Sequence, residues 1–357
     1  MKQFFKFMFA SCLGVFLSTI ILIVTFFIIV TSIISASTKS VPDIEENSVL
    51  VIKLDKPIYD REVSDFSDLF MSGKEDIDVS SSIGLTEFIA VINKAKTDPN
   101  IKAIMLDLSI IQANGWATVQ EMRDALAGFK ESKKKIYAFS DTYTQNAYYL
   151  ATVADEISLN PVGHLQLTGL GGQVMFVKDL LNKFDIDVEL LRPANNDYKS
   201  AGEMFVNNKM SEANRTQIKA YVSSIWDYIA NNMSQSRKID INTLNKNVSN
   251  LETFMAEDAL KNKYVDNLTF RTDIQEKIKK DLNLKKVNWV QYKKYRNSIV
   301  EIMPKGKDQI AVIYAFGDVA QGKGGDLSIG SETIVKEIRR AVENSRVKAI
   351  VLRINSG

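Results

Sequence analysis

The sequence predicts an α/β protein that is built around a parallel sheet and preceded by one membrane-spanning helix. Strand-like and helix-like segments alternate at the spacing of βαβ units, which is the pattern of a parallel sheet. A long uncharged stretch occupies the N-terminus. The chain has 357 residues, 45% of them hydrophobic, so it can bury the core of one large or two medium domains.

Charge and cysteine content narrow the classes of partner. The 45 basic and 43 acidic side chains give a formal charge of +2, so nothing favours a nucleic-acid partner. The lysines of "ESKKKIY" (131–137) are interpreted as a solvated helix end, because no aromatic residues alternate with them on a common face. Cys12 is the only cysteine, so an intramolecular disulfide is excluded and the redox compartment stays open.

The N-terminal stretch predicts a membrane anchor at 9–36. No charged residue occurs between Lys6 and Lys39. This length exceeds the ~20 residues that cross a bilayer as a helix and the ~7–15 residues of a signal-peptide core, so retention is favoured over cleavage at "SAS" (35–37). Because Lys2 and Lys6 lie on the short side, the tip at 1–8 is expected in the cytoplasm and the remainder outside it.

The elements after the anchor follow from apolar runs and their punctuation. The helix at 84–100 is predicted to stop at Asp98-Pro99. Its apolar residues at helical spacing are Leu85, Phe88, Ile89, Ile92 and Ala95. The expected order is a strand at 48–58, a polar loop at 59–83, that helix, a strand at 101–109, a helix at about 116–130 and a strand at 135–141. Two helical stretches at about 211–235 and 250–281, with no strand between them, are interpreted as peripheral helices or an assembly arm.

The last fifty residues repeat the first part of this pattern. Residues 309–319 echo the strand at 48–58, and residues 331–356 echo 85–109. Lys102-Ala103-Ile104 and Lys348-Ala349-Ile350 fall in register at an offset of 246 residues. A period this long indicates a duplicated domain, with one complete copy and the opening of a second.

Most ordinary catalytic machinery is missing from the sequence. His164 is the only histidine and is expected to be a loop or packing residue, so a Ser/His/Asp triad and a His/Cys metal site are both disfavoured. "QGKGGD" (321–326) lacks the GK[ST] of a phosphate loop and predicts a flexible turn. Asp155 and Glu156 are neighbours whose side chains should point apart. No cofactor and no metal are predicted.

Lys199, in "NNDYKSAGEMF" (195–205), is the candidate general base. A lysine deprotonates a serine hydroxyl only when it is uncharged near pH 7, which requires its pKa to fall by roughly three units from about 10.4. Burial among apolar walls is the usual means, and the stretch offers four such residues. The competing interpretation is a surface ion pair with Asp197 or Glu203. The possible walls are Tyr198, Ala201, Met204 and Phe205.

The segments "IYAFSD", 142–170 and "YKSAGEMF" together resemble the signal peptide peptidase A family, in its long two-domain form. The resemblance covers essentially the whole chain. It implies a Clp protease/crotonase fold and a Ser/Lys serine protease that degrades cleaved signal peptides and other short apolar peptides. It also implies a homo-oligomer, a tetramer in the family, in the bacterial inner membrane. Lys199 takes the place of the family's general base, with Ser200 or nearby backbone orienting it.

The resemblance divides the chain into modules. It implies a first domain at 48–205 that carries the base, a helical connecting or assembly region at 206–305, and the start of a second, truncated domain at 306–357. In the family the second domain carries the nucleophile in a stretch like D-M-A-A-S-G-G-Y-Y. In the first copy, "DTYTQNAYY" (141–149), the serine and two glycines are replaced by Gln145, Asn146 and Ala147.

The matching serine of the second copy is therefore expected near position 391, about 34 residues beyond Gly357, and the chain as given is expected to be inactive alone. The family's N-S-P-G-G stretch, whose backbone helps to form the oxyanion hole, reads "INSG" here, which leaves the oxyanion site in doubt.

Two alternatives stay open at the level of the sequence. One is a non-catalytic, membrane-bound scaffold or peptide-binding protein of the same fold. The other is a crotonase-type acyl-CoA enzyme. The predicted extracytoplasmic location argues against the latter, and "SIIQANG" (109–115) has no double-glycine oxyanion loop.

Overall fold

The computed structural model describes residues 2–37, 42–62, 82–113, 115–193, 195–299, 306–325 and 327–356. The chain divides into two compact units. One comprises Met1–Asp43 and Asn297–Val300, and the other comprises Ile44–Arg296 and Glu301–Gly357.

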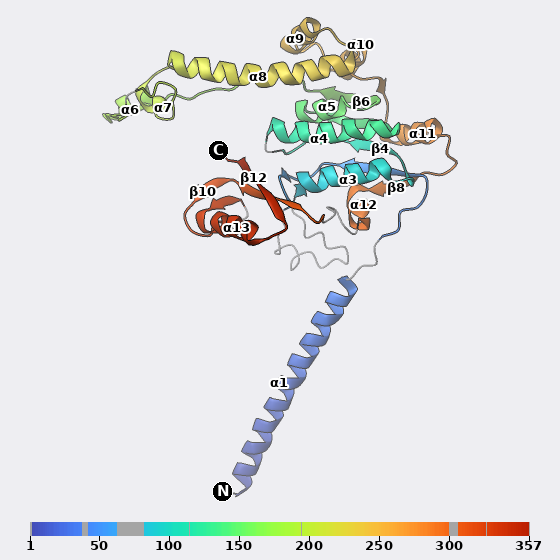
Figure 1. The fold of residues 1–357 in the computed structure, drawn as a ribbon, viewed down its shortest axis with the longest axis vertical. Helices are drawn as coiled ribbons and strands as arrows, with labels where there is room; N and C mark the ends of the chain where they lie inside the picture. The colour runs from blue at the N-terminus through green and yellow to red at the C-terminus, as the bar shows by residue number, and fades with distance from the viewer. Residues whose placement is uncertain are drawn as a thin grey trace. The chain divides into compact units, whose positions relative to one another are not determined.

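The first unit contains the helix α1, Lys2–Ser37 (Figure 1). Within it, Lys6–Ile28 is a stretch of 23 residues that is long and apolar enough to cross a membrane, and none of it is buried. Signal sequences have the same properties, so length and composition identify either an anchor or a leader. The predicted helix at 9–36 is confirmed as a helix.

A six-stranded sheet forms the centre of the second unit. Its strand order is β7-β6-β5-β4-β1-β8, and each neighbouring pair is parallel. The predicted α/β architecture with a parallel sheet is therefore confirmed. The strands are β1 (Ser48–Lys53), β4 (Ile101–Asp107), β5 (Lys135–Tyr143), β6 (Glu156–Leu165), β7 (Asn267–Leu268) and β8 (Asn288–Gln291).

The strands carry apolar residues on both faces of the sheet, so helices cover it. On one face, α11 (Arg271–Asp281) packs Ile274 and Ile278 against the sheet. The helices α3 (Leu85–Thr97) and α4 (Trp116–Phe129) pack against each other, and α4 is followed by the 3₁₀ helix η1, Lys130–Ser132 (Figure 1). The strand residues under α11 are Val49, Ala103, Met105, Tyr137 and Phe139.

The α3 helix ends as predicted, at Asp98 before Pro99. Four of its five predicted core positions are buried; Ile89 is only partly buried, and Val91 is buried beside them. The contacts at the C-terminal end of α3 correct the interpretation of the lysines in 131–137 as a solvated helix end. Lys134 Nζ donates hydrogen bonds to Ala95 O (2.9 Å) and Asp98 O (2.6 Å), so one of these lysines caps α3.

The strand predicted at 48–58 is shorter than expected. β1 ends at Lys53, and the chain re-enters an extended pairing only in β2 (Ile58–Tyr59), which lies parallel to β3 (Ile83–Gly84). Pro57 lacks the backbone N–H that a continued ladder needs. Most of the predicted loop at 59–83 falls outside the described residues.

The helical stretch predicted at about 211–235 is confirmed, whereas the one predicted at 250–281 is wrong as a continuous helix, because β7 separates two helices there. The region 206–305 contributes β7, which pairs with β6, and β8, which pairs with β1. Strands of two and four residues are too short to show periodicity, so the sequence pattern misses them. Its helices besides α11 are α8 (Glu212–Arg237), α9 (Ile241–Ser249), α10 (Ala256–Lys261) and α12 (Tyr292–Ser298).

The C-terminal residues form a further parallel pair, β9 (Gln309–Phe316) with β12 (Val347–Asn355). The helix α13 (Ser331–Glu343) connects them, after the short parallel pair β10 (Asp318–Ala320) and β11 (Ser328–Gly330). The predicted turn at 321–326 includes Gly322 and Gly324 with φ of 84° and 66°, which glycine adopts without strain.

Candidate active site

Lys199 lies in an irregular segment that extends from the sheet. The segment runs from the end of β6 through α6 (Lys178–Lys183) to α7 (Glu203–Val206). Figure 1 shows α6 and α7 near the N-terminal end of α8, away from the sheet. We call residues 171–211 the arm. Lys199 itself is exposed, and its backbone N–H donates to Asn196 O at 3.2 Å.

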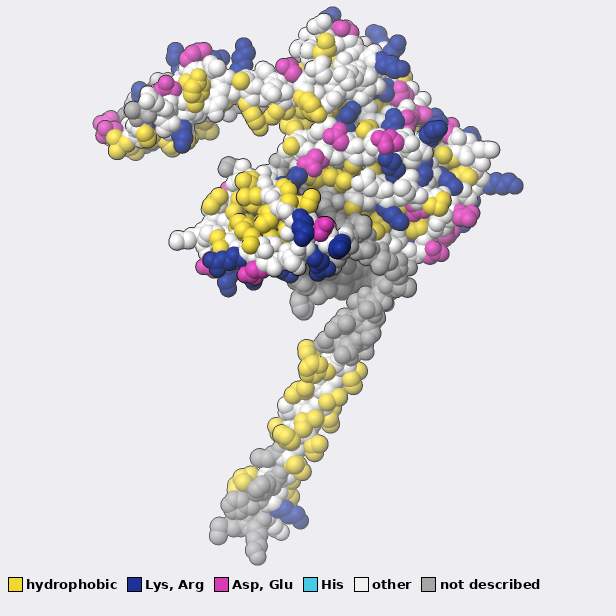
Figure 2. Space-filling model, viewed as in Figure 1, with side chains coloured by type: hydrophobic (Ala, Val, Ile, Leu, Met, Phe, Trp, Pro, Cys, Tyr) yellow, Lys and Arg dark blue, Asp and Glu magenta, His cyan; other side chains and the backbone are white. Residues whose placement is uncertain are grey.

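The apolar walls expected around Lys199 do not enclose it. Tyr198 is 61% exposed and Phe205 42% exposed, Ala201 is exposed, and only Met204 is half-buried. The described residues of the arm form no strand, and the arm carries many exposed apolar side chains, part of the yellow surface of that segment in Figure 2. The four possible walls therefore leave Lys199 exposed in this chain. The large exposed apolar residues of the arm include Met175, Leu180, Phe184, Ile186, Leu190 and Leu191.

The alternative interpretation, a surface ion pair at Lys199, is not seen either. Within the part of the chain that the structure describes, no ion pair or side-chain hydrogen bond involves the Lys199 ammonium. The carboxylate of Glu203 is used elsewhere, because Ser211 and Asn214 donate hydrogen bonds to it. Asp197 is exposed. Lys199 therefore has no carboxylate partner among the described residues.

Gln145, which the sequence comparison aligned with the expected serine position, is the first residue of α5 (Gln145–Ala151). Its Oε1 accepts hydrogen bonds from the backbone N–H of Thr168 (3.0 Å) and Gly169 (2.8 Å). Its Nε2 donates to Gly169 O at 3.1 Å. The amide thus closes the N-terminus of α5 against 168–169. It offers no nucleophile, and its hydrogen-bonding groups are occupied.

Ion pairs occupy the carboxyl end of the sheet, where parallel α/β folds commonly bind ligands. Arg271 contacts Asp107 at the end of β4 and Asp141 on β5, the latter at 3.3 Å. Its guanidinium lies 5.0 Å from the Phe139 ring centroid. The hydrogen bond that Arg271 donates to Asp107, opposed by partial burial, raises the pKa of Arg271. Arg271 lies 164 residues from Asp107 in the chain, so no local sequence pattern predicts this cluster.

The remaining sequence candidates have structural roles. His164 stacks on Phe254, with ring centroids 4.9 Å apart, so its packing role is confirmed. Asp155 pairs with Lys130 at 2.8 Å, whereas Glu156 pairs with Lys277 at 2.6 Å, which confirms that these two carboxylates point apart.

The C-terminal strand β12 carries "INS" of the expected oxyanion stretch at its end. Asn355 O accepts a hydrogen bond from Gly317 N at 2.9 Å. Two residues earlier, Arg353 contacts Asp60 Oδ1 at 2.9 Å and Glu121 Oε1 at 2.8 Å. Thr86 Oγ1 and the Tyr314 hydroxyl lie 2.8 Å apart. These contacts join β9 and β12 to the N-terminal half of the second unit.

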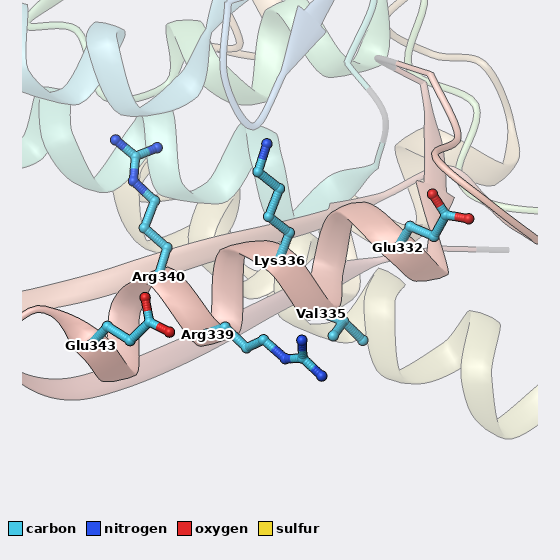
Figure 3. Close-up of a pocket in the computed structure, with 6 residues that line it drawn as sticks. All are labelled: Glu332, Val335, Lys336, Arg339, Arg340 and Glu343. Atoms are coloured by element: carbon cyan, nitrogen blue, oxygen red, sulfur yellow. The ribbon is translucent and has the colours of Figure 1, made fainter.

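A groove on α13 lies apart in sequence from both Lys199 and Gln145. Lys336 and Arg340 extend from the helix on the opposite side from Arg339 and Val335 (Figure 3). Its lining is formed by one helix and includes neither candidate catalytic position. The lining residues are Glu332, Val335, Lys336, Arg339, Arg340 and Glu343.

Residues 128–285 match peptidase family S49. Three curated relatives align with most of the chain. Protease 4 of Haemophilus influenzae is 27% identical over 78% of this chain and 47% of its own length. Protease 4 of Salmonella typhi is 30% identical over 76% of this chain and 45% of its own. Serine protease SPPA, chloroplastic, of Arabidopsis thaliana is 27% identical over 78% and 42%.

The chain thus spans somewhat under half the length of the curated relatives it matches. The matched region includes Gln145, the arm with Lys199, and the strands β6 and β7. The sequence resemblance to signal peptide peptidase A is confirmed, and residues 128–285 are similar to peptidase family S49.

Proposed function

We propose that this chain is part of a membrane-anchored serine protease with a Ser/Lys dyad, in which Lys199 is the general base and another module supplies the serine. The observation that carries the proposal is a lysine without a carboxylate partner among the described residues, held on a fixed segment inside the S49-matched region. The named relatives support a protease. Signal peptides and other short apolar peptides are the proposed substrates.

The proposed reaction begins when the neutral Lys199 amine takes the proton of the serine hydroxyl as its oxygen attacks the peptide carbonyl. The resulting ammonium then protonates the leaving amine, and water hydrolyses the acyl-enzyme with the same lysine as base. The ammonium is solvated in this chain, so the serine-bearing module or another copy must cover it. The exposed apolar side chains of the arm supply a surface on which such a cover can pack.

We further propose that the fold is a duplicated Clp/crotonase-like fold with domains at 48–205 and from 306, connected by 206–305. Two parallel pairs, β1–β4 and β9–β12, support this interpretation, because each is connected by a helix of 13 residues. Gly84 and Gly330 precede these helices with nearly the same backbone angles, φ −80°, ψ 129° and φ −83°, ψ 128°.

The same proposal places residues 1–8 in the cytoplasm, α1 in the bacterial inner membrane and the sheet outside the cytoplasm, within a homo-oligomer. The apolar α1 segment and the two lysines at its start support this orientation.

The decisive experiment is Lys199→Ala in the full-length protein, with hydrolysis of a fluorogenic apolar peptide as the readout. Removing a general base should lower kcat by about 10²–10⁴-fold or abolish turnover. Lys209→Ala is the matched control, since Lys209 is an exposed lysine of the same arm. Activity that survives Lys199→Ala while Lys209→Ala behaves like the parent would remove Lys199 from the mechanism.

A second candidate, a peptide-binding scaffold, is favoured by one observation. Gln145 fills the nucleophile position of the first copy with its hydrogen bonds to 168–169. A scaffold would bind apolar peptides with unchanged affinity after Lys199→Ala and would hydrolyse none of them. Measured turnover by the full-length parent therefore excludes this candidate.

A further inference from the structure

We infer that Glu203 is a positioning residue for the base Lys199. Its buried carboxylate holds the loop between Arg192 and Glu203, which we call the lysine loop, and thereby determines the position of the Lys199 amine. This inference rests on the proposed function, because it concerns the same lysine. Glu203 lies four residues after Lys199, at the first position of α7, and its side chain is only 3% exposed. A buried carboxylate is costly unless it is fully hydrogen-bonded.

Donors from the start of α8 surround this carboxylate. Ser211 Oγ donates to Oε1 at 2.5 Å, and Ser211 N (3.2 Å) and Asn214 Nδ2 (3.0 Å) both donate to Oε2. Ser211 is also the N-cap of α8, where its Oγ accepts from Asn214 N at 3.2 Å. Glu203 therefore ties the end of the lysine loop to a helix of 26 residues.

The beginning of the loop is held at the same place. Arg192 Nη1 lies 3.9 Å from Glu203 Oε1, close enough for a charge interaction. Next to it, the Leu190 side chain packs so closely on Gly202 that a Cβ at this glycine would lie 2.4 Å from Leu190 Cδ1. Contacts near Arg192 and at Glu203 thus hold the two ends of the segment that contains Lys199.

The geometry also argues against a catalytic role for Glu203 and against an ion pair between Glu203 and Lys199. Each of its described contacts comes from a donor on α8 or from Arg192, and none comes from Lys199. The carboxylate fixes the loop without neutralising the lysine. An acid that both held the loop and paired with the amine would favour the charged form, which is the wrong form for a base.

The test is Glu203→Gln in the full-length protein. An amide NH₂ in place of Oε2 meets the N–H donors of Ser211 and Asn214, and one in place of Oε1 faces Arg192 and keeps a hydrogen bond only if the Ser211 hydroxyl turns, so the closure is weakened in either orientation. A displaced catalytic group costs on the order of 10–100-fold, which should appear in kcat with KM changed by less than about twofold. Backbone amides of 196–205 should exchange with solvent faster. Ser211→Ala, which removes one donor and the cap, should shift both measurements in the same direction.

Glu212→Gln is the matched control, because Glu212 is an exposed acid beside Ser211 in the first turn of α8. It should leave kcat and the exchange of 196–205 unchanged. Glu203→Asp, which keeps the charge on a shorter side chain, should recover part of the lost kcat. An unchanged kcat in Glu203→Gln, with Lys199→Ala inactive, would overturn the positioning role and leave the proposed function standing. Full activity in Lys199→Ala would overturn both.

Discussion

Lys277 shows at the scale of one residue how a partly buried cation stabilises the sheet. Its Nζ lies 2.6 Å from Glu156 Oε2 and 2.9 Å from Asp281 Oδ2. Burial alone would lower the pKa of Lys277, but the hydrogen bonds to Glu156 and Asp281 raise it. The hydrogen bond from Lys277 lowers the pKa of Asp281. Lys277 therefore links β6 to α11 by charge as well as by packing.

We predict that Lys277→Met lowers the free energy of unfolding by about 0.5–1 kcal/mol at pH 7, since the pair is about one-third exposed and screened by solvent. The pKa of Asp281 is depressed in the folded state, so its contribution is present above its ordinary value near 3.9 and is lost as the pH falls through the lower folded value. The difference between variant and parent should shrink toward pH 3. Urea unfolding of the detergent-solubilised protein at both pH values measures it.

Lys279→Met is the control for this prediction. Lys279 lies two residues further along α11 and reaches only Glu276, at 3.6 Å on the exposed surface. Its replacement should change the stability by less than about 0.5 kcal/mol at either pH. An equal loss in both variants would assign the effect to helix propensity or net charge.

At the scale of elements, α8 connects the sheet domain with the lysine loop. Its C-terminal half docks through Ile229, Ala230 and Met233, which are buried. Asn232 Nδ2 donates to the Tyr149 hydroxyl on α5 at 2.8 Å, and Arg123 Nη2 on α4 donates to Ser236 Oγ at 2.6 Å. The N-terminal end of the same helix supplies the donors for Glu203. The buried apolar residues of α8 all lie in its C-terminal half, so its N-terminal end is left to bind Glu203.

We predict that Tyr149→Phe loosens the docked half of α8. The change removes a hydroxyl that contacts both Gln120 and Asn232, and it leaves their polar atoms partly buried without that partner. The expected cost is about 1–2 kcal/mol, with faster hydrogen exchange at 226–237. Tyr228→Phe is the control on the same helix, because Tyr228 is 54% exposed. Equal exchange in both variants would contradict a role for this hydrogen bond in docking.

The sequence predicted the elements whose residues repeat over several turns or strand positions. The α3 helix and the strands β4 and β5 follow directly from apolar spacing and the Asp98-Pro99 stop. The strands β7 and β8 were not predicted, because a short edge strand is recognised only by its pairing with a strand that lies far away in the chain. The position of Lys199 was predictable only from a motif, whereas its exposure depends on neighbours that no local pattern specifies.

At the scale of the whole second unit, Arg353 joins the C-terminal strands to the first part of the sheet domain. Asp60 is 2% exposed, and its contact with Arg353 is a charge–charge contact at 2.9 Å that lacks hydrogen-bond geometry. Arg353 donates its hydrogen bond to Glu121 instead, at 2.8 Å. The Tyr59 and Phe316 rings, with centroids 5.3 Å apart, add an apolar contact between the same parts.

We predict that Arg353→Gln destabilises this junction by roughly 2 kcal/mol or more, because it leaves the buried Asp60 carboxylate without its cation. The double variant Arg353→Gln with Asp60→Asn should recover part of the loss, since it removes the stranded charge. Lys348→Gln is the control, because Lys348 lies 3.9 Å from Asp308, both side chains are well exposed, and its hydrogen bond to Ser345 O (3.0 Å) stays on the surface. Thermal unfolding of the four proteins tests this, and a double variant less stable than Arg353→Gln alone would refute the pairing.

Asp107 and Arg353 stand at the same register position of β4 and β12, since Ala103 and Ala349 are likewise 246 residues apart. Asp107 meets a cation, Arg271, while Arg353 meets two acids. If one strand took the other's place, an acid would face acids or an arginine would face an arginine. Opposite charge at this one shared position therefore distinguishes two strands of similar sequence, because exchanging them would place like charges in contact.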